Sequence, residues 1–224
     1  MTRDADILVA TTRRAQTTGQ WDTPTRHAGK SIPVTGALPV RQSMWQGDLM
    51  GEDDFDDVLI RGAAVSDAAR IAAVHIRSWR QAYAGIVPST HLAALDEADR
   101  TRRWEADLRS GPQDDVRTWI AESGHQLLGF ATLGPSRDED AERGDVEIYS
   151  IYLDPGTWGQ GVARDLMRTL LHEVPAGVTV RLWVMADNER ARHFYRRHGF
   201  APDGAERLDE IGGAEVLEVR YRRG

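Results

Sequence analysis

The stretch TWGQGVARDLM, residues 157–167, places two glycines one residue apart directly before a segment with helical periodicity. It follows the strongly apolar stretch DVEIYSIYLDP, residues 145–155, which is typical of a buried central strand. A strand that ends in a glycine turn and continues into a helix leaves several backbone N–H groups unpaired beside the positive end of the helix dipole. The local sequence therefore predicts a cradle for phosphate oxygens.

Two common phosphate-binding motifs do not fit this turn. A P-loop has a lysine followed by Ser or Thr after its second glycine, whereas this chain continues with Val162, Ala163 and Arg164. A dinucleotide-binding fingerprint has a third Gly or Ala three residues after the second glycine, where Arg164 stands. An enzyme that uses this turn for a nucleotide phosphate is therefore the weakest of three functional hypotheses.

The composition of the 224 residues narrows the class of protein. Hydrophobic residues make up 41% and charged residues 28%, which is typical of a globular domain, and no apolar run approaches the roughly 18 residues of a membrane span. The N-terminal region also lacks the apolar core of a signal peptide. We therefore expect a cytoplasmic protein that makes no contact with a membrane.

Charge and cysteine content limit the chemistry further. The net charge of −7 disfavours nucleic acid as a partner, since nucleic acid binds to basic surfaces, and it favours cationic partners. Because the chain has no cysteine, it has neither thiolate metal ligands nor a cysteine that carries an acyl group. His75, His193 and His198 do not have metal-ligand spacing, so we expect no metal.

The chain divides into two parts that differ in composition and in hydrophobic periodicity. Residues 1–56 are rich in Thr, Gly, Gln, Arg and Asp and show no sustained hydrophobic period, so we predict a flexible, disordered leader that folding and activity do not require. Met50 is an alternative natural start. Residues 57–224 are predicted to form one domain. Its order of elements is strand, helices, hairpin, strand, helix, strand, helix and hairpin, which indicates an α/β sheet with a parallel crossover in the middle.

Two motifs in this domain resemble the GNAT superfamily of N-acyltransferases. The window that begins at Trp158 and continues through Gly161 and Ala163 is similar to the acyl-CoA signature, although the family pattern begins with Arg or Gln. The later stretch ADNERARHFYRRHGF, residues 186–200, resembles a second family segment. Its matching positions are Asn188, Ala191, Phe194, Tyr195, Gly199 and Phe200. The resemblance covers about residues 58–224.

This resemblance implies a fold and a co-substrate. The implied fold is a mixed, mainly antiparallel sheet of about six to seven strands, with a central parallel pair that splays apart and helices on both sides. The implied co-substrate is acetyl-CoA, with its pantetheine arm in the gap between the splayed strands. The residues implied to bind it are Ile151, Tyr152, Leu153, Trp158, Gly159, Gln160, Gly161, Val162, Ala163 and Asn188.

The implied reaction is direct attack of a primary amine on the acetyl thioester in a ternary complex. An alkyl ammonium has a pKa of about 10.4 and must lose a proton before it attacks, whereas a thiol with a pKa of about 8.5 leaves with modest help. Tyr195 stands where the family places the general acid. Glu147 is the candidate base, because strand alternation puts it on one face with Tyr149, Ile151 and Leu153.

Structural alternatives stand beside each of these roles. Glu147 fits a structural salt bridge, with water as the proton acceptor, and Tyr195 fits core packing. Asn188 fits a helix cap, which is compatible with a ligand contact, and the two glycines fit an ordinary turn.

Trp79, Tyr83 and Tyr149 are predicted to form an aromatic wall for the acceptor amine, through cation–π attraction if the amine is charged. Core packing is the alternative for Trp79. The acceptor classes left open are aminoglycoside-like or polyamine-like compounds, amino acids, and protein N-termini or lysines. A non-catalytic acyl-CoA-binding sensor or interaction domain is the alternative function, and a homodimer is the expected assembly.

Overall fold

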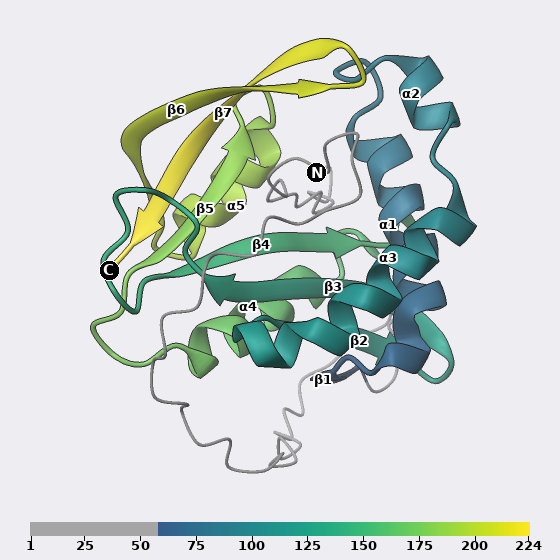
Figure 1. Cartoon of the computed structure of the whole chain (residues 1–224), viewed down its shortest axis with the longest axis horizontal. Helices are drawn as coiled ribbons and strands as arrows, with labels where there is room; N and C mark the ends of the chain where they lie inside the picture. The colour runs from purple at the N-terminus through teal and green to yellow at the C-terminus, as the bar shows by residue number, and fades with distance from the viewer. Residues whose placement is uncertain (1–57) are drawn as a thin grey trace, which may run out of the picture. The chain divides into compact units, whose positions relative to one another are not determined.

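The computed structural model describes residues 58–224 (Figure 1). The predicted leader, its boundary and the alternative start at Met50 lie outside these residues. The strands are β1 (Leu59–Gly62), β2 (Arg117–Ser123), β3 (Gln126–Pro135), β4 (Val146–Leu153), β5 (Val180–Met185), β6 (Ala201–Ile211) and β7 (Ala214–Arg223). The helices are α1 (Ala68–Ala82), α2 (Ser89–Ala93), α3 (Glu97–Ser110), α4 (Val162–Glu173) and α5 (Glu189–Arg197), with short 3-10 turns η1 (Val65–Asp67), η2 (Gly111–Asp114) and η3 (Pro155–Thr157).

The strands of residues 58–224 form one mixed sheet in the order β1-β2-β3-β4-β5-β7-β6. Each neighbouring pair is antiparallel except β4 and β5, which are parallel and are joined through α4. This arrangement confirms the predicted sheet with a central parallel pair. Residues 58–224 contain no helix that is long and apolar enough to cross a membrane.

Helices cover both faces of the sheet, and each face has its own core. On one face, α4 and α5 bury Leu166, Met167 and Phe194 against β3, β4 and β5. On the other face, α1 and α3 bury Ile71 and Trp104 against the sheet. The apolar stripe of α4, which includes Leu166, Met167 and Leu170, explains why this helix packs back onto the sheet in the connection between the two parallel strands.

The parallel pair is short. Its register pairs Val146 with Val180 and Glu147 with Arg181, and no further pairing of β4 with β5 occurs within the described part of the chain. Beyond this point β5 continues beside β7, while β4 continues beside β3, so the two strands diverge (Figure 1). We call the paired end the root and the diverging end the mouth.

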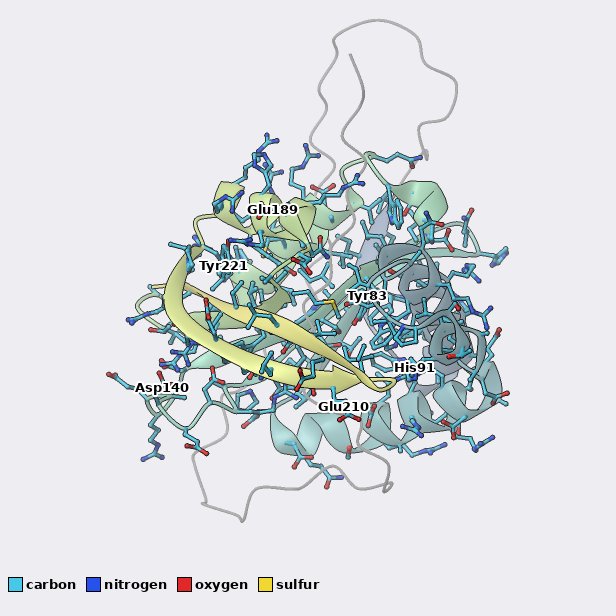
Figure 2. The ribbon with its side chains drawn as sticks, turned by 90° about the horizontal axis from the view of Figure 1, so that it is seen from above. Tyr83, His91, Asp140, Glu189, Glu210 and Tyr221 are labelled. Carbon is cyan, nitrogen blue, oxygen red and sulfur yellow. The ribbon has the colours of Figure 1, made fainter. Side chains whose placement is uncertain are left out.

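The hairpin of β6 and β7 reaches from the far edge of the sheet toward α2. Gly212 at its tip lies against the imidazole of His91, and a β carbon there would approach Cγ of that ring to 2.5 Å (Figure 2). Ile211 and Val216 pack in the same core as Tyr83. The hairpin therefore brings residues from the C-terminal end of the chain beside α1 and α2.

The connection between β3 and β4 is tied to the second half of the sheet by ion pairs with two buried arginines, Arg181 and Arg220. Arg181 of β5 donates to Asp140 at 2.7 Å and to Asp145 at 2.9 Å. Arg220 of β7 donates to both carboxylate oxygens of Asp140, at 2.6 and 2.7 Å, and to Asp203 at 2.8 Å. We call these residues the aspartate–arginine network; it holds the root of the parallel pair together.

Candidate active site

The glycine turn has the predicted backbone conformation. Gly159 and Gly161 have φ values of 82° and 84°, in the left-handed region that favours glycine. Gly161 is the N-cap of α4, and no side chain caps the helix there. The first N–H groups of α4 thus remain available to an anion, as the sequence predicts.

Trp158 occupies the position where the family pattern has Arg or Gln. Its indole packs against the core on the α4 side, and its buried Nε1 has no hydrogen-bond partner within residues 58–224. The guanidinium of Arg164 lies close to Gly161 instead, because a β carbon built there would meet Nη2 at 3.0 Å. A cation is therefore present at the turn, supplied by α4 rather than by residue 158.

A β-bulge in β4 overturns one prediction. The register pairs Thr132 with Ser150 and Leu133 with Ile148, so that Tyr149 is an extra residue between these two pairs. Ile148 then packs in the same core as Ile151, although strict alternation would separate them. Strand parity changes at the bulge.

As a consequence, the predicted common face of Glu147, Tyr149, Ile151 and Leu153 is wrong. Ile151 and Leu153 are buried toward α4. Glu147 pairs with Gly134 in the register, and a β carbon on that glycine would meet the Tyr149 hydroxyl at 2.6 Å. Glu147 and Tyr149 therefore lie toward the opposite face, the side of α1 and α3.

Glu147 is buried at the root, and Arg137 holds both of its carboxylate oxygens. Arg137 donates from Nη2 to Oε1 at 2.5 Å and from Nε and the backbone N to Oε2 at 3.3 and 3.1 Å. Tyr149 belongs to the same group, since its hydroxyl donates to the Pro135 carbonyl at 2.7 Å and its ring lies 3.7 Å from the Arg137 guanidinium carbon. Burial raises the pKa of Tyr149 to about 12.

Three fully buried tyrosines meet at the mouth. Tyr83 comes from α1, Tyr152 from β4 and Tyr195 from α5, and the Tyr195 hydroxyl has no hydrogen-bond partner in the described part of the chain. Burial raises the pKa of Tyr152 to about 12 and the pKa values of Tyr83 and Tyr195 well above their ordinary range. At neutral pH all three phenols keep their protons and are able to donate them in hydrogen bonds.

The three hydroxyls are close enough to influence one another. Tyr152 contributes to the raised pKa values of both Tyr83 and Tyr195, after burial. The side chain of Tyr152 packs in the core on the α1 side of the sheet, and Tyr195 of α5 packs in the core on the other side, at the end where β4 and β5 are no longer paired. The sequence predicted only backbone contacts for Tyr152, so its side chain is an addition to the site.

Aromatic side chains of α1 and α3 surround this group. The Trp79 and Tyr83 ring centroids are 4.9 Å apart, and the rings are nearly perpendicular. His75 stacks on Tyr152 at 4.6 Å, and its Nδ1 accepts a hydrogen bond of 3.3 Å from Trp104. Burial, assisted by the charge of Arg100, lowers the pKa of His75 well below its usual value.

The structure thus separates the three predicted wall residues. Trp79 and Tyr83 lie together beside Tyr152, whereas Tyr149 contacts Arg137 and Gly134. Asn188 caps α5, with its Oδ1 accepting from the Ala191 N–H at 3.0 Å, in agreement with the capping alternative.

Two further observations bound the site. No group of three or more His, Asp or Glu residues within 58–224 is arranged to hold a metal ion. An open hollow of about 630 Å³ lies in the turn after α1, between Arg80, Val87, Leu92 and Ala214, and none of its lining residues is a predicted site residue.

Comparison with known proteins agrees with this geometry. Residues 76–200 match the acetyltransferase (GNAT) family. The probable N-acetyltransferase Rv2775 of Mycobacterium tuberculosis is 31% identical over 171 residues, which cover 74% of this chain and 93% of that protein. The chain therefore belongs to the GNAT acetyltransferase family.

Solved structures share the fold. The PaiA N-acetyltransferase of Thermoplasma acidophilum, solved with coenzyme A, aligns with a TM-score of 0.58 at 18% identity over 75% of this chain and 99% of that chain. YncA, a putative acetyltransferase of Salmonella typhimurium solved with acetyl-CoA, aligns with a TM-score of 0.56 at 22% identity over 75% and 93%. At these identities the likeness concerns the fold.

Proposed function

We propose that this N-acetyltransferase transfers the acetyl group of acetyl-CoA to a primary amine of a small molecule or peptide, by direct attack in a ternary complex. The observation that carries this proposal is the Tyr195 hydroxyl, which is buried, protonated and without a partner in residues 58–224 at the mouth. A buried hydroxyl without a partner costs about 1–3 kcal/mol, so a ligand that accepts its hydrogen bond stabilises the site.

The residues present fit acetyl-CoA. The N–H groups of Gly159 to Ala163 would hold the pyrophosphate at the start of α4, and Arg164 adds a positive charge there. The backbone of Ile151 to Leu153 would pair with the pantetheine arm, because β5 has left this edge of β4. Asn188 would contact the arm from α5 through the part of its side chain that does not cap the helix, and Trp158 would pack beside it.

Acetyl-CoA supplies an activated acetyl thioester. Tyr195 donates its phenolic proton to the sulfur as the carbon–sulfur bond breaks. As the nitrogen–carbon bond forms, the amine nitrogen loses one proton to a base or to water, and a second proton replaces the one that Tyr195 gave to the sulfur. The raised pKa of Tyr195 keeps its proton in place until the thiolate develops.

Glu147 remains a candidate for the base, but its contacts support the salt-bridge alternative. Arg137 engages both carboxylate oxygens, and the residue sits at the root, where β4 and β5 are still paired. The acceptor would lie against Trp79 and Tyr83, and Tyr149 would contact it from the part of the site where Arg137 lies.

A cytoplasmic location and a homodimer that forms through the terminal strands also remain proposals. The exposed side chains of Leu208 and Leu217, which form a cross-strand pair, support the homodimer.

Calorimetric titration tests the cofactor assignment. Acetyl-CoA should bind wild-type protein with micromolar affinity, whereas ATP should not compete. Gly161→Ala places a β carbon where φ is 84° and should weaken binding about tenfold, since the left-handed conformation costs roughly 1–2 kcal/mol. Gly177→Ala is the matched control, because Gly177 has a φ of 83° with open space around it, away from the turn.

Two outcomes would contradict the proposal. If acetyl-CoA does not bind, or if Gly161→Ala and Gly177→Ala bind it equally well, the glycine turn is not the cofactor cradle. If acetyl-CoA binds but no primary amine is acetylated, the alternative of a non-catalytic acyl-CoA sensor replaces the enzyme.

A further inference from the structure

Glu218 is a completely buried carboxylate on β7 with no role in the account above. Its register partners are Met185 on β5 and Arg207 on β6. Directly paired residues of antiparallel strands point to the same face, and Met185 packs in the core that contains Tyr83 and Tyr152. Val216, two residues away on β7, packs in that core as well. Glu218 therefore points to the side of the sheet that carries the aromatic group.

Arg207 is one partner of this carboxylate. It donates from Nε to Oε2 at 2.6 Å, and its Nη2 lies 2.5 Å from the same oxygen. The Arg207 guanidinium carbon is held 4.2 Å from the centre of the Trp183 ring. The ion pair with Arg207 thus orients the Glu218 carboxylate on the face of the sheet to which Met185 and Val216 also point.

The charge of Glu218 reaches the tyrosines at the mouth. Burial is the main cause of the raised pKa values of Tyr83 and Tyr152, and the negative charge of Glu218 raises both further. The carboxylate thus lies on the side of the sheet where the rings of Trp79, Tyr83 and Tyr152 pack, at the end of β5 that has diverged from β4. Aromatic faces together with a buried carboxylate are the chemistry that binds an ammonium group.

We propose that Glu218 binds the ammonium group of the acceptor and takes its proton as the nitrogen attacks the thioester. The acceptor is then a primary amine that is positively charged at neutral pH. This inference rests on the proposed function. It assigns the proton acceptor to β7, at the mouth, rather than to Glu147 at the root.

The proton balance of this step is complete. As the nitrogen–carbon bond forms and the carbon–sulfur bond breaks, the nitrogen loses two protons. One passes to Glu218 and then to solvent. The other replaces the proton that Tyr195 gives to the sulfur, so both residues return to their initial states.

The test compares Glu218→Gln with wild-type protein, both as full chains, using benzylamine and spermidine as charged acceptors and aniline as a neutral one. Wild-type protein should acetylate the charged amines in preference to aniline. Glu218→Gln should lower kcat/KM for benzylamine about 100-fold near neutral pH, the usual size of a base contribution. The affinity for acetyl-CoA, measured by calorimetry, should not change.

The pH profile separates a proton acceptor from a structural carboxylate. For wild-type protein, kcat/KM for benzylamine should be level from about pH 7 to about pH 9, because the enzyme removes the proton itself. For Glu218→Gln it should rise about tenfold per pH unit, since only the free amine already in solution reacts. Glu215→Gln removes an exposed carboxylate from the same strand and should keep the level profile.

The outcomes distinguish this inference from the proposed function. A level profile in Glu218→Gln, or a wild-type preference for aniline, overturns the inference while acetyl transfer stands. Acetyl-CoA binding without acetylation of any amine overturns both. If Glu218→Gln does not fold, Glu218→Asp and the wild-type preference between benzylamine and aniline decide the question.

Discussion

The two ends of the parallel pair treat buried polar groups in opposite ways. At the root, Glu147 is bound by Arg137, and Arg181 is bound by Asp140 and Asp145. At the mouth, Tyr195 is equally buried, yet its hydroxyl has no hydrogen-bond partner in the described part of the chain. Fully paired groups stabilise a fold, whereas unpaired ones cost free energy until something binds. The comparison therefore places stability at the root and chemistry at the mouth.

The largest effect should come from Tyr195→Phe. Removing the hydroxyl removes the proton donor for the sulfur, so kcat should fall by about 10²–10⁴-fold, measured by release of free coenzyme A. The melting temperature should stay the same or rise, because the substitution deletes a buried polar group that has no partner in the described chain.

Tyr221→Phe is the matched control for this prediction. Tyr221 is also fully buried, but its hydroxyl accepts hydrogen bonds from Arg192 and Arg196, each at 3.2 Å. Its loss should lower the free energy of unfolding by about 1 kcal/mol and leave turnover intact. Equal effects of the two substitutions on turnover would remove the distinction between the mouth and ordinary core.

At the root, Arg181→Met should act on stability. It leaves the buried carboxylate of Asp145 without the arginine that compensates its charge, and we expect a loss of about 3 kcal/mol in the free energy of unfolding in urea. Arg168→Met, on the exposed side of α4, should change it by less than about 0.5 kcal/mol. A loss for Arg181→Met no greater than for Arg168→Met would show that the network does not hold the root.

Local sequence was sufficient to predict the cradle and the order of the elements. The conformation of Gly159 and Gly161 could be predicted because a turn before a helix needs the left-handed region that glycine favours. The apolar runs on either side of them have the length and periodicity of a strand and a helix. The bulge at Tyr149 could not be predicted, since one extra residue in an apolar strand does not change the composition of that strand in a recognisable way. Every assignment of a face in β4 that relied on alternation across Tyr149 failed with it.

The partners of the buried carboxylates could not be predicted from the local sequence either. Arg137 binds Glu147 across a loop, and the charge of Glu218 acts on Tyr83 because the β6–β7 hairpin packs in the same core as this tyrosine. A signal for Glu218 did exist. It is a charged residue in the otherwise apolar run VLEV, the same argument that singled out Glu147. Applying that argument to every strand would have found both residues.

The smallest predicted effect concerns Asp107 on α3, the helix that packs beside the mouth. Arg100 of the same helix lies near both Tyr152 and Asp107. Burial raises the pKa of Asp107 from 3.8 to about 6. The folded state therefore holds this proton more tightly than the unfolded state, so its contribution to stability is present below about pH 4 and is lost as the pH rises through about 6. Asp107→Asn mimics the protonated form and should raise the free energy of unfolding at pH 8 by about 1 kcal/mol, with the gain vanishing in acid.

Asp99→Asn on the same helix should have the opposite sign. Asp99 lies in the first turn of α3 and pairs with Arg102 and Arg103 at the surface, so its charge is favourable there and its removal should cost roughly 0.5 kcal/mol at pH 8. Urea unfolding of both variants at pH 4 and pH 8 measures the difference. If Asp107→Asn does not raise the free energy of unfolding at pH 8, the Asp107 carboxylate is as well paired as the carboxylates at the root. Within this comparison, the lack of a partner is then confined to the mouth.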